Sequence, residues 1–318
     1  MPDQFETESR MGAAASTQAV VPEPVGEQPD REFTVSERSQ AQLVLRRFRQ
    51  HRLAMISLIL LAVIILFAYI GGALWKYHAN DITPDNSQPP SLDHPFGTDA
   101  VGHDAMAQVM RGTQISLQIS VLVAVFATFV GAIWGAVAGF YRGATDSVLM
   151  RVADLVLTLP LLAVAAVLAH NVGGTWWLIA VVIAGLYWAN VSRISRGVVL
   201  SLREKEFVEA SRALGASDAR IIFRHLVPNA LGSIIVYATV LVALSILLET
   251  ALSFLGFGVT PPDTSLGLLV SNNQTAVDTR PWLFYFPGLF IILIVLTINF
   301  IGDGLRDAFD PQQTKVRA

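Results

Sequence analysis

The residues best suited to chemistry lie in a stretch between two apolar segments, residues 76–113. Four side chains of metal-ligand type occur there: His94, Asp99, His103 and Asp104. Their spacing matches no strong metal-ligand pattern. Pro95 and Gly97 instead indicate a turn, and Asp and Thr side chains commonly cap backbone groups in such loops. We therefore predict a structured loop and no metal site.

The chain lacks the motifs of common nucleotide-binding and hydrolytic enzymes. Its three lysines are Lys76, Lys205 and Lys315, and none follows a glycine, so a GxxxxGK[ST] phosphate-binding loop is excluded. Neither HExxH nor GxSxG occurs. The absence of cysteine excludes a thiol nucleophile and Cys-ligated zinc. We predict no catalytic residue, and no enzyme activity, in this chain.

The composition indicates a membrane protein rather than a soluble domain. Hydrophobic residues make up 53% of the 318 residues and charged residues only 15%, with a mean hydropathy of +0.52. An average soluble domain carries about 25% charged residues. The net charge of −3 argues against a general nucleic-acid-binding protein.

Six apolar segments are candidates for membrane spans. They run roughly over Leu53–Leu74, Ile115–Phe140, Val148–Ala169, Trp176–Val191, Ala230–Leu255 and Leu283–Ile301. The first contains 22 residues without a charge, enough for about 33 Å of helix. Pro160 should kink the third span. The sequence thus predicts an all-α integral membrane protein with six transmembrane helices.

The basic residues predict the orientation of these spans. Lys and Arg concentrate before the first span, between the second and third, between the fourth and fifth, and after the sixth. The alternate loops are poor in these residues, and cytoplasmic loops are the ones enriched in Lys and Arg. We therefore expect both termini and residues 201–229 in the cytoplasm, and residues 76–113 outside.

Two features inside the spans are candidates for packing or function. Four small residues follow each other at four-residue spacing in the second span, which favours close helix packing: Ala127, Gly131, Gly135 and Gly139. Ionisable groups at membrane depth are few, and such groups are candidates for function. Glu249 is a candidate pathway residue, and Asp154 a weaker one, although both could be hydrogen-bonded packing residues.

The loop of residues 201–229 has a pattern of its own. Residues 204–214 have helical spacing, with apolar Phe207, Ala210 and Leu214 along one face. Gly215 should end this helix, and Ser217 should cap a second short helix. Pro228 should stop that second helix before the fifth span. Apolar side chains in such a loop must pack on the spans or meet a partner.

Several motifs carry a family resemblance. Glu209, Ala210 and Ser211, followed by Gly215 and Pro228, resemble the EAA loop of bacterial ABC importer permeases. The segments HPFGTD at 94–99, LREKEF at 202–207, LSFLG at 252–256 and GDGLRD at 302–307 look like the peptide permease family. More narrowly, they resemble the C-type subunit of oligopeptide and dipeptide importers. The resemblance covers residues 40–311, and Ser211 departs from it by replacing the second alanine of the EAA pattern.

The resemblance implies a type I ABC importer permease with the MetI-like architecture, a multi-pass protein of the bacterial cell membrane (inner or plasma membrane). A second homologous permease would complete the pathway, and an extracytoplasmic binding protein would deliver the peptide. Cytoplasmic ATPase subunits would bind ATP and Mg, and no cofactor is expected in this chain. The coupling loop to the ATPase would comprise Phe207, Glu209, Ala210, Ser211, Leu214, Gly215 and Pro228.

The resulting organisation has four parts. They are a disordered cytoplasmic tail (1–45), the first span with its outer loop (46–112), a five-helix permease core (113–305) and a cytoplasmic tail (306–318). Oligopeptide uptake is the favoured function, with dipeptide or nickel uptake as alternatives within the family. The alternatives from other classes are an ATP-independent secondary transporter, a membrane enzyme and a purely structural membrane subunit.

Overall fold

The computed structural model describes residues 40–309. Most of the predicted N-terminal tail (1–45) and of the C-terminal tail (306–318) lies outside the described residues. The prediction differs from the structure at residues 40–45, which form the first part of helix α1 (Gln40–Gln50). Phe48 of α1 is buried beside Ala54 and Ala308, and this contact holds α1 against the helix that follows it and the helix that ends the described chain.

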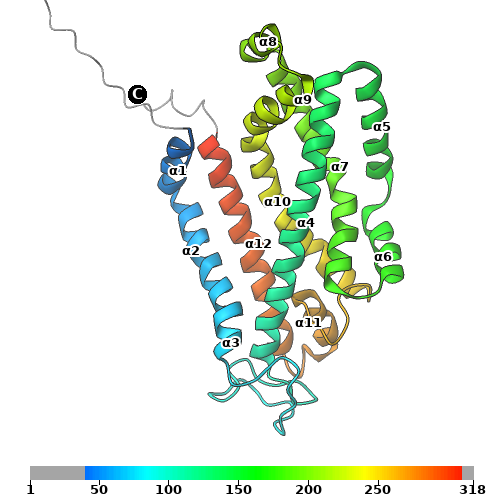
Figure 1. Cartoon of the computed structure of the whole chain (residues 1–318). Coiled ribbons are helices and arrows are strands. Elements are labelled where there is room, and N and C mark those ends of the chain that lie inside the picture. Colours follow the sequence, from blue (N-terminus) through cyan, green and yellow to red (C-terminus); the bar gives the residue numbers. More distant parts are fainter. Residues whose placement is uncertain (1–39, 310–318) are drawn as a thin grey trace, which may run out of the picture. The chain divides into compact units, whose positions relative to one another are not determined.

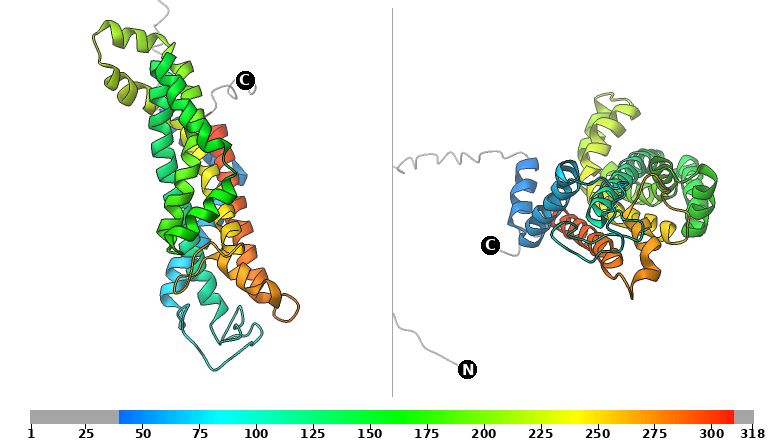
Figure 2. Two further views of the ribbon diagram at one scale, coloured as in Figure 1. Left: turned by 90° about the vertical axis from the view of Figure 1, so that its right-hand side faces the viewer. Right: turned by 90° about the horizontal axis from the view of Figure 1, so that it is seen from below.

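The described chain is built from helices, with only two isolated bridges in place of strands. After α1 come α2 (Arg52–Leu66), η1 (Phe67–Gly71), α3 (Gly72–Leu74), α4 (Ala105–Tyr141), α5 (Gly143–Thr158), α6 (Leu161–Val172), α7 (Trp176–Arg203), α8 (Glu206–Ala213), α9 (Asp218–Arg220), η2 (Ile221–Leu226), α10 (Val227–Phe254), α11 (Leu266–Asn273), η3 (Gln274–Ala276) and α12 (Trp282–Phe309). Figures 1 and 2 show the long helices running side by side.

Five helical segments of the described part are long and apolar enough to cross a membrane, and a sixth exists if the bent pair α5–α6 forms one span. The six correspond in order to the predicted spans. The bend between α5 and α6 is 85° and falls at Leu159 and Pro160, where a proline kink was expected. The helices extend beyond the apolar segments, for example to Arg203 in α7, because a helix can continue into water after its hydrophobic part ends.

The small-residue stripe of α4 faces α7 of the same chain. A β-carbon on Gly131 would lie 2.5 Å from the carbonyl oxygen of Trp188, and one on Gly135 would lie 2.1 Å from that of Ser192. The Ser195 hydroxyl donates to the carbonyl oxygen of Ala132 at 2.8 Å across the same contact. Backbones this close exclude side chains, so the stripe is occupied by an internal neighbour.

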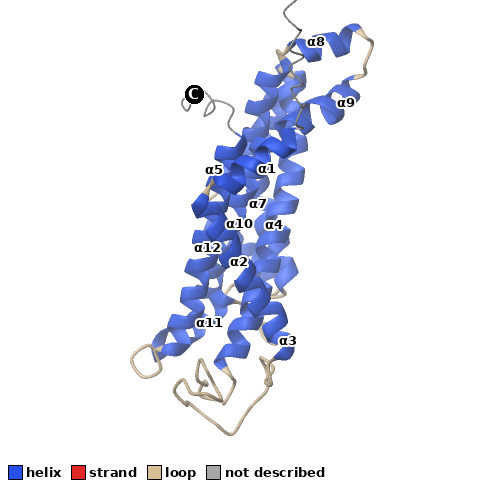
Figure 3. Ribbon diagram, turned by 90° about the vertical axis from the view of Figure 1, so that its left-hand side faces the viewer, coloured by secondary structure: helices blue, strands red, loops and turns tan. Residues whose placement is uncertain are grey.

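The two ends of the helix bundle differ. One end carries α8 and α9 and is called the α8 end (Figure 3). The opposite end carries the loop of residues 75–104 together with α11, and is called the α11 end (Figures 1 and 2). Between them, α10 packs against α4, α7, α11 and α12, so it contacts most of the bundle.

Candidate functional site

The loop of residues 201–229 forms one short separate helix, α8, and the start of a second, longer helix. The helix α8 is followed by a turn, and α9, η2 and α10 then continue as one helix from Asp218 to Phe254. The expectation that Pro228 stops the second helix is therefore wrong. Pro228 lies in the first turn of α10, directly after the wide π-helical turn of η2, where the missing proline N–H interrupts no regular α-helical ladder.

Gly215 terminates α8 by a left-handed backbone conformation, with φ of 79°. The Ala216 N–H donates to the carbonyl oxygen of Ser211 at 3.0 Å, and the Gly215 N–H donates to that of Arg212 at 2.9 Å. This pair of bonds is the Schellman arrangement, which favours glycine. Ser217 occupies the cap position of α9, but its side chain makes no cap hydrogen bond, contrary to expectation.

A single side chain of α8 is buried, and it is Val208. It lies in a cluster formed by α4, α7 and η2, whose other members are Ala136, Phe140, Val199, Ile221, Ile222 and Leu226. Phe207 remains 38% exposed and Leu214 88% exposed, while Glu209 and Ala210 are also exposed. The apolar residues of the loop thus divide into a buried set that anchors it and an exposed set on α8 and its turn.

Arginines hold the base of this loop against α4. The Arg203 guanidinium donates to the carbonyl oxygen of Phe140 at 2.5 Å, and Arg142 pairs with Glu204. The guanidinium groups of Arg203 and Arg212 also lie over the Phe140 ring, at 5.7 Å and 5.3 Å from its centroid. No local sequence pattern indicated these contacts, because the partners are about 60 residues apart.

Asp154, the weaker of the two ionisable candidates, belongs to a ladder of ion pairs between α5 and α7. Arg193 donates to Asp154 at 2.5 Å, and Arg196 donates two hydrogen bonds to Asp146, of 2.5 Å and 2.6 Å. A bidentate arginine–carboxylate pair fixes geometry as well as charge. These contacts fasten α5 to α7 on the α8-end side of the bend at Pro160.

At the α11 end, the ligand-type side chains of residues 76–113 serve the loop itself. Asp104 is fully buried and accepts from the Ala107 N–H at 2.7 Å and from the Trp75 ring N–H at 3.1 Å. Its other oxygen contacts His94 Nδ1 at 2.7 Å, and the Tyr77 ring stacks on His94. No group of three or more His, Asp or Glu residues in the described chain could hold a metal ion.

The second pair, Asp99 and His103, builds a turn. One Asp99 oxygen accepts from the backbone N–H groups of Val101, Gly102 and His103, and the other contacts His103 Nδ1 at 2.7 Å. Burial alone would raise the pKa of Asp99, but the hydrogen bonds from His103 and from the backbone outweigh it and lower the pKa below its ordinary value.

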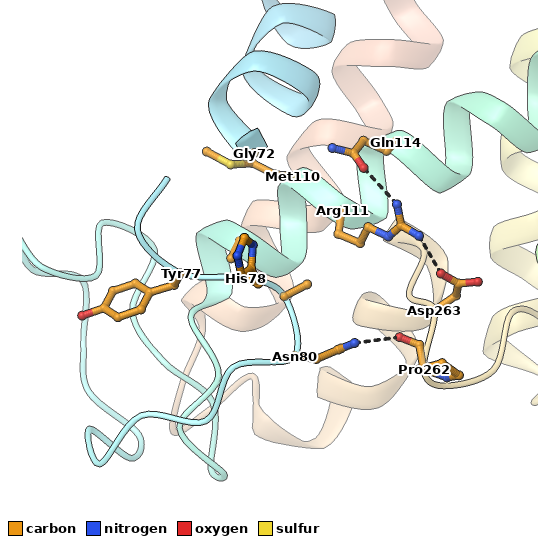
Figure 4. A pocket seen from close by; sticks show the side chains of 11 residues that line it. Gly72, Tyr77, His78, Asn80, Met110, Arg111, Gln114, Pro262 and Asp263 are labelled. Atoms are coloured by element: carbon orange, nitrogen blue, oxygen red, sulfur yellow. Dashed lines mark hydrogen bonds and ion pairs between the residues drawn. The ribbon is translucent and has the colours of Figure 1, made fainter. Parts of the chain in front are cut away.

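Two adjoining cavities open at the α11 end. Figure 4 shows the first, of about 360 Å³, between the start of α4 and the segment that precedes α11. There Arg111 pairs with Asp263 at 2.8 Å and donates to Gln114 at 3.1 Å, while the Asn80 amide donates to the Pro262 carbonyl oxygen at 3.3 Å. The second cavity, of about 620 Å³, shares Asn80, Pro262 and Asp263 with the first and extends along α11.

Glu249 is enclosed by the protein and has no contact with solvent. Its side chain is fully buried, and one of its oxygens accepts hydrogen bonds from Ser253 and Ser265. The position of Glu249 late in its span was evident from the sequence, whereas these partners were not.

Comparison with known proteins decides the class. The sequence matches the family described as binding-protein-dependent transport system inner membrane component over residues 131–315, which is more than half of the chain. The chain belongs to this family. Residues 39–90 also match the N-terminal transmembrane domain of oligopeptide transport permease C. As a family member with five or six apolar helices, the chain is a multi-pass protein of the bacterial inner membrane.

Curated relatives of the family agree with this assignment. The oligopeptide transport system permease protein OppC of Mycobacterium tuberculosis is 42% identical over 88% of this chain and 97% of its own length. OppC of Bacillus subtilis is 41% identical over 85% of this chain and 88% of its own length. A putative peptide permease protein of Brucella suis is 46% identical over 84% of this chain and 89% of its own length.

The fold also matches a solved permease. A chain of the MetNI methionine ABC transporter in an inward-facing conformation superimposes with a TM-score of 0.54 at 16% identity. The match covers 64% of this chain and 97% of that chain. It establishes the MetI-like fold that the resemblance predicted.

Proposed function

We propose that this family member is the permease subunit of an ATP-driven peptide importer and that α8 is its docking element for a cytoplasmic ATPase. The observation that carries the proposal is which side chains of α8 are buried and which are exposed. Val208 is its one buried side chain and Arg212 lies over the Phe140 ring, whereas Phe207 and Ala210, with Leu214 directly after the helix, are exposed. Exposed apolar side chains on a well-anchored helix are typical of a surface that a partner covers.

The sequence of the chain and its family resemblance suggest the partners. The chain has no phosphate-binding loop, so ATP and Mg would be bound by partner ATPase subunits. A second, homologous permease would complete the pathway, and an extracytoplasmic binding protein would dock at the α11 end. This assignment of the ends rests on the basic residues of the α8 end, which favour the cytoplasm.

The continuous helix from Asp218 to Phe254 supports a mechanism for coupling. The cluster around Val208 includes Ile221, Ile222 and Leu226, which belong to that helix. A displacement of α8 by the ATPase would therefore move the start of α10. Coupling requires that the ATPase contacts differ between the two states of the pathway.

Oligopeptides are the favoured substrates. The relatives from Mycobacterium tuberculosis and Bacillus subtilis are named as oligopeptide permeases, and the match covers nearly their whole length. Dipeptide or nickel uptake are the alternatives within the family. An ATP-independent secondary transporter is the alternative from another class, and it would need charged coupling sites inside the membrane. Of the candidates for that role, Asp154 pairs with Arg193, and one oxygen of Glu249 accepts from two serines.

Reconstitution tests the proposal. The chain is assembled with its partner permease and ATPase in proteoliposomes, the binding protein is added outside, and uptake of a labelled pentapeptide is followed. We expect uptake only when ATP is present on the ATPase side. Uptake by the two permeases alone, driven by an ion gradient and unaffected by ATP, would contradict the proposal.

A further inference from the structure

Glu249 joins two helices at the α11 end. Its Oε1 atom accepts from the Ser253 hydroxyl at 2.7 Å, one turn further along α10. The same atom accepts from the Ser265 hydroxyl at 2.6 Å, and Ser265 is the N-cap residue of α11. The first bond stays within α10, whereas the second crosses to another helix.

Hydrogen bonds join the start of α11 to α10 and to α4. The Ser265 hydroxyl accepts from the Leu268 N–H at 3.0 Å while it donates to Glu249. The Leu266 N–H donates to the Ser116 hydroxyl of α4 at 3.1 Å.

The contact between α10 and α11 has no spare room. A β-carbon on Gly267 would lie 2.6 Å from the Cα of Thr250 and 3.1 Å from Oε2 of Glu249. That Oε2 atom is buried and has no hydrogen-bond partner in the described chain. A buried carboxyl group with an unpartnered oxygen is costly, so its presence here points to a role beyond packing.

The two helices joined by Glu249 lead to opposite ends of the molecule. Residues Leu268, Leu269, Asn272 and Asn273 of α11 line the larger cavity at the α11 end. Helix α10 continues without a break through η2 to the cluster that anchors α8. The Glu249–Ser265 bond therefore lies on a direct covalent and hydrogen-bonded route between these two surfaces.

We propose that Glu249 is a positioning residue that fixes α11 to α10, so that a partner binding at the α11 end moves the helix that carries the coupling loop. This inference rests on the proposed function, in which that partner is the substrate-binding protein. Glu249 acts through Ser265, and it contacts neither the substrate nor ATP.

The test uses four variants of the full chain in the assembled, nanodisc-embedded transporter. Ser265→Ala and Glu249→Leu both remove the bond between the helices, and Glu249→Leu leaves intact the cap bond that the Leu268 N–H donates to Ser265. Ser253→Ala is the matched control, because it removes the bond within α10 on the same oxygen. Glu249→Gln is the rescue, because its carbonyl oxygen can still accept from both serines.

Three quantities are measured for each variant. The first is the ratio of ATP hydrolysis with and without peptide-loaded binding protein. The second is the mobility of a spin label at Asn272→Cys on α11, attached to the purified chain before assembly; the label has a single site there because the natural chain contains no cysteine. Thermal stability of the complex is recorded in parallel.

We expect Ser265→Ala and Glu249→Leu to mobilise the label and to lower the stimulation ratio at least about five-fold, the lower end of common coupling strengths. Ser253→Ala and Glu249→Gln should resemble the natural chain, and Ser265→Ala should keep its basal hydrolysis. An immobile label in both bond-breaking variants would overturn the inference, as would an unchanged stimulation ratio. If the natural complex shows no stimulation, the proposed function fails, and the label alone decides whether Glu249 positions α11.

Discussion

Gly135 of α4 lies directly against the backbone of Ser192 in α7. A β-carbon on Gly135 would lie 2.1 Å from the Ser192 carbonyl oxygen and 2.8 Å from the Arg196 backbone nitrogen. Both neighbouring atoms belong to the backbone, so no side-chain movement can relieve the clash. We expect Gly135→Ala to force the helices apart and to reduce the amount of folded protein in the membrane, measured by fluorescence size-exclusion of the solubilised chain.

Gly197 provides the matched control for that prediction. It lies on α7, close to the same contact, but a β-carbon added there would meet no atom within 4 Å. Gly197→Ala should therefore be tolerated, and its higher helix propensity favours the fold by about 1 kcal/mol. Equal abundance of the two variants would show that the close approach does not matter for stability.

The turn at Gly215 gives a second prediction. Its φ of 79° is unfavourable for residues with a β-carbon, by about 1–2 kcal/mol, although nothing crowds the position. Gly215→Val should misplace α8 and reduce ATP-driven uptake while the protein still reaches the membrane. Gly215→Asn should retain most uptake, since asparagine adopts the left-handed conformation more readily. Normal uptake by the valine variant would refute the role of the turn.

The stability of the turn that Asp99 builds should decrease in one direction of pH only, toward acid. Because hydrogen bonds lower the pKa of Asp99 in the folded protein, its stabilising contribution is complete above the ordinary pKa of 3.8 and disappears as pH falls through the lowered value. Amide protection at Val101, Gly102 and His103, measured by hydrogen exchange, should be constant near neutral pH and decrease only in strong acid. Asp99→Asn should remove this decrease, and a loss of protection between about pH 6 and 8 in the natural chain would contradict the assignment.

The orientation of the chain is tested by labelling. Leu92 is 100% exposed in the loop at the α11 end, and Ser217 is exposed beside α9. In the cysteine-free chain, Leu92→Cys should react with a membrane-impermeant thiol reagent on intact cells, and Ser217→Cys should react only after the membrane is permeabilised. The opposite pattern would reverse the proposed orientation and place α8 outside.

Much of the fold was predictable from the sequence because apolar length and glycine spacing are local signals. The bend at Pro160 and the left-handed turn at Gly215 follow from residue types alone. The partner of the α4 glycine stripe could not be predicted, since spacing says that a neighbour is close but not which one. Only the structure identifies α7 as that neighbour.

The candidate site was predictable in part for a similar reason. The pattern of residues 201–229 indicated a helix with an apolar face, but it could not show that Val208 is the buried residue and Ala210 an exposed one. The helix continues past Pro228 after the wide turn of η2, and no sequence pattern predicted that turn. The links from Arg196 to Asp146 and from Glu249 to Ser265 join distant segments, so they appear only in three dimensions.

Docking of α8 on an ATPase is tested most directly at Ala210. This residue is exposed and small, so Ala210→Trp keeps the helix but obstructs a close contact, whereas Val208→Ala weakens the internal anchor instead. Co-purification of the ATPase with the tagged permease pair is measured for each variant together with permease abundance. For Ala210→Trp we predict normal permease abundance and loss of ATPase co-purification. For Val208→Ala we predict reduced stability of the permease. Full ATPase recovery with Ala210→Trp, at normal abundance, would contradict the docking role of α8.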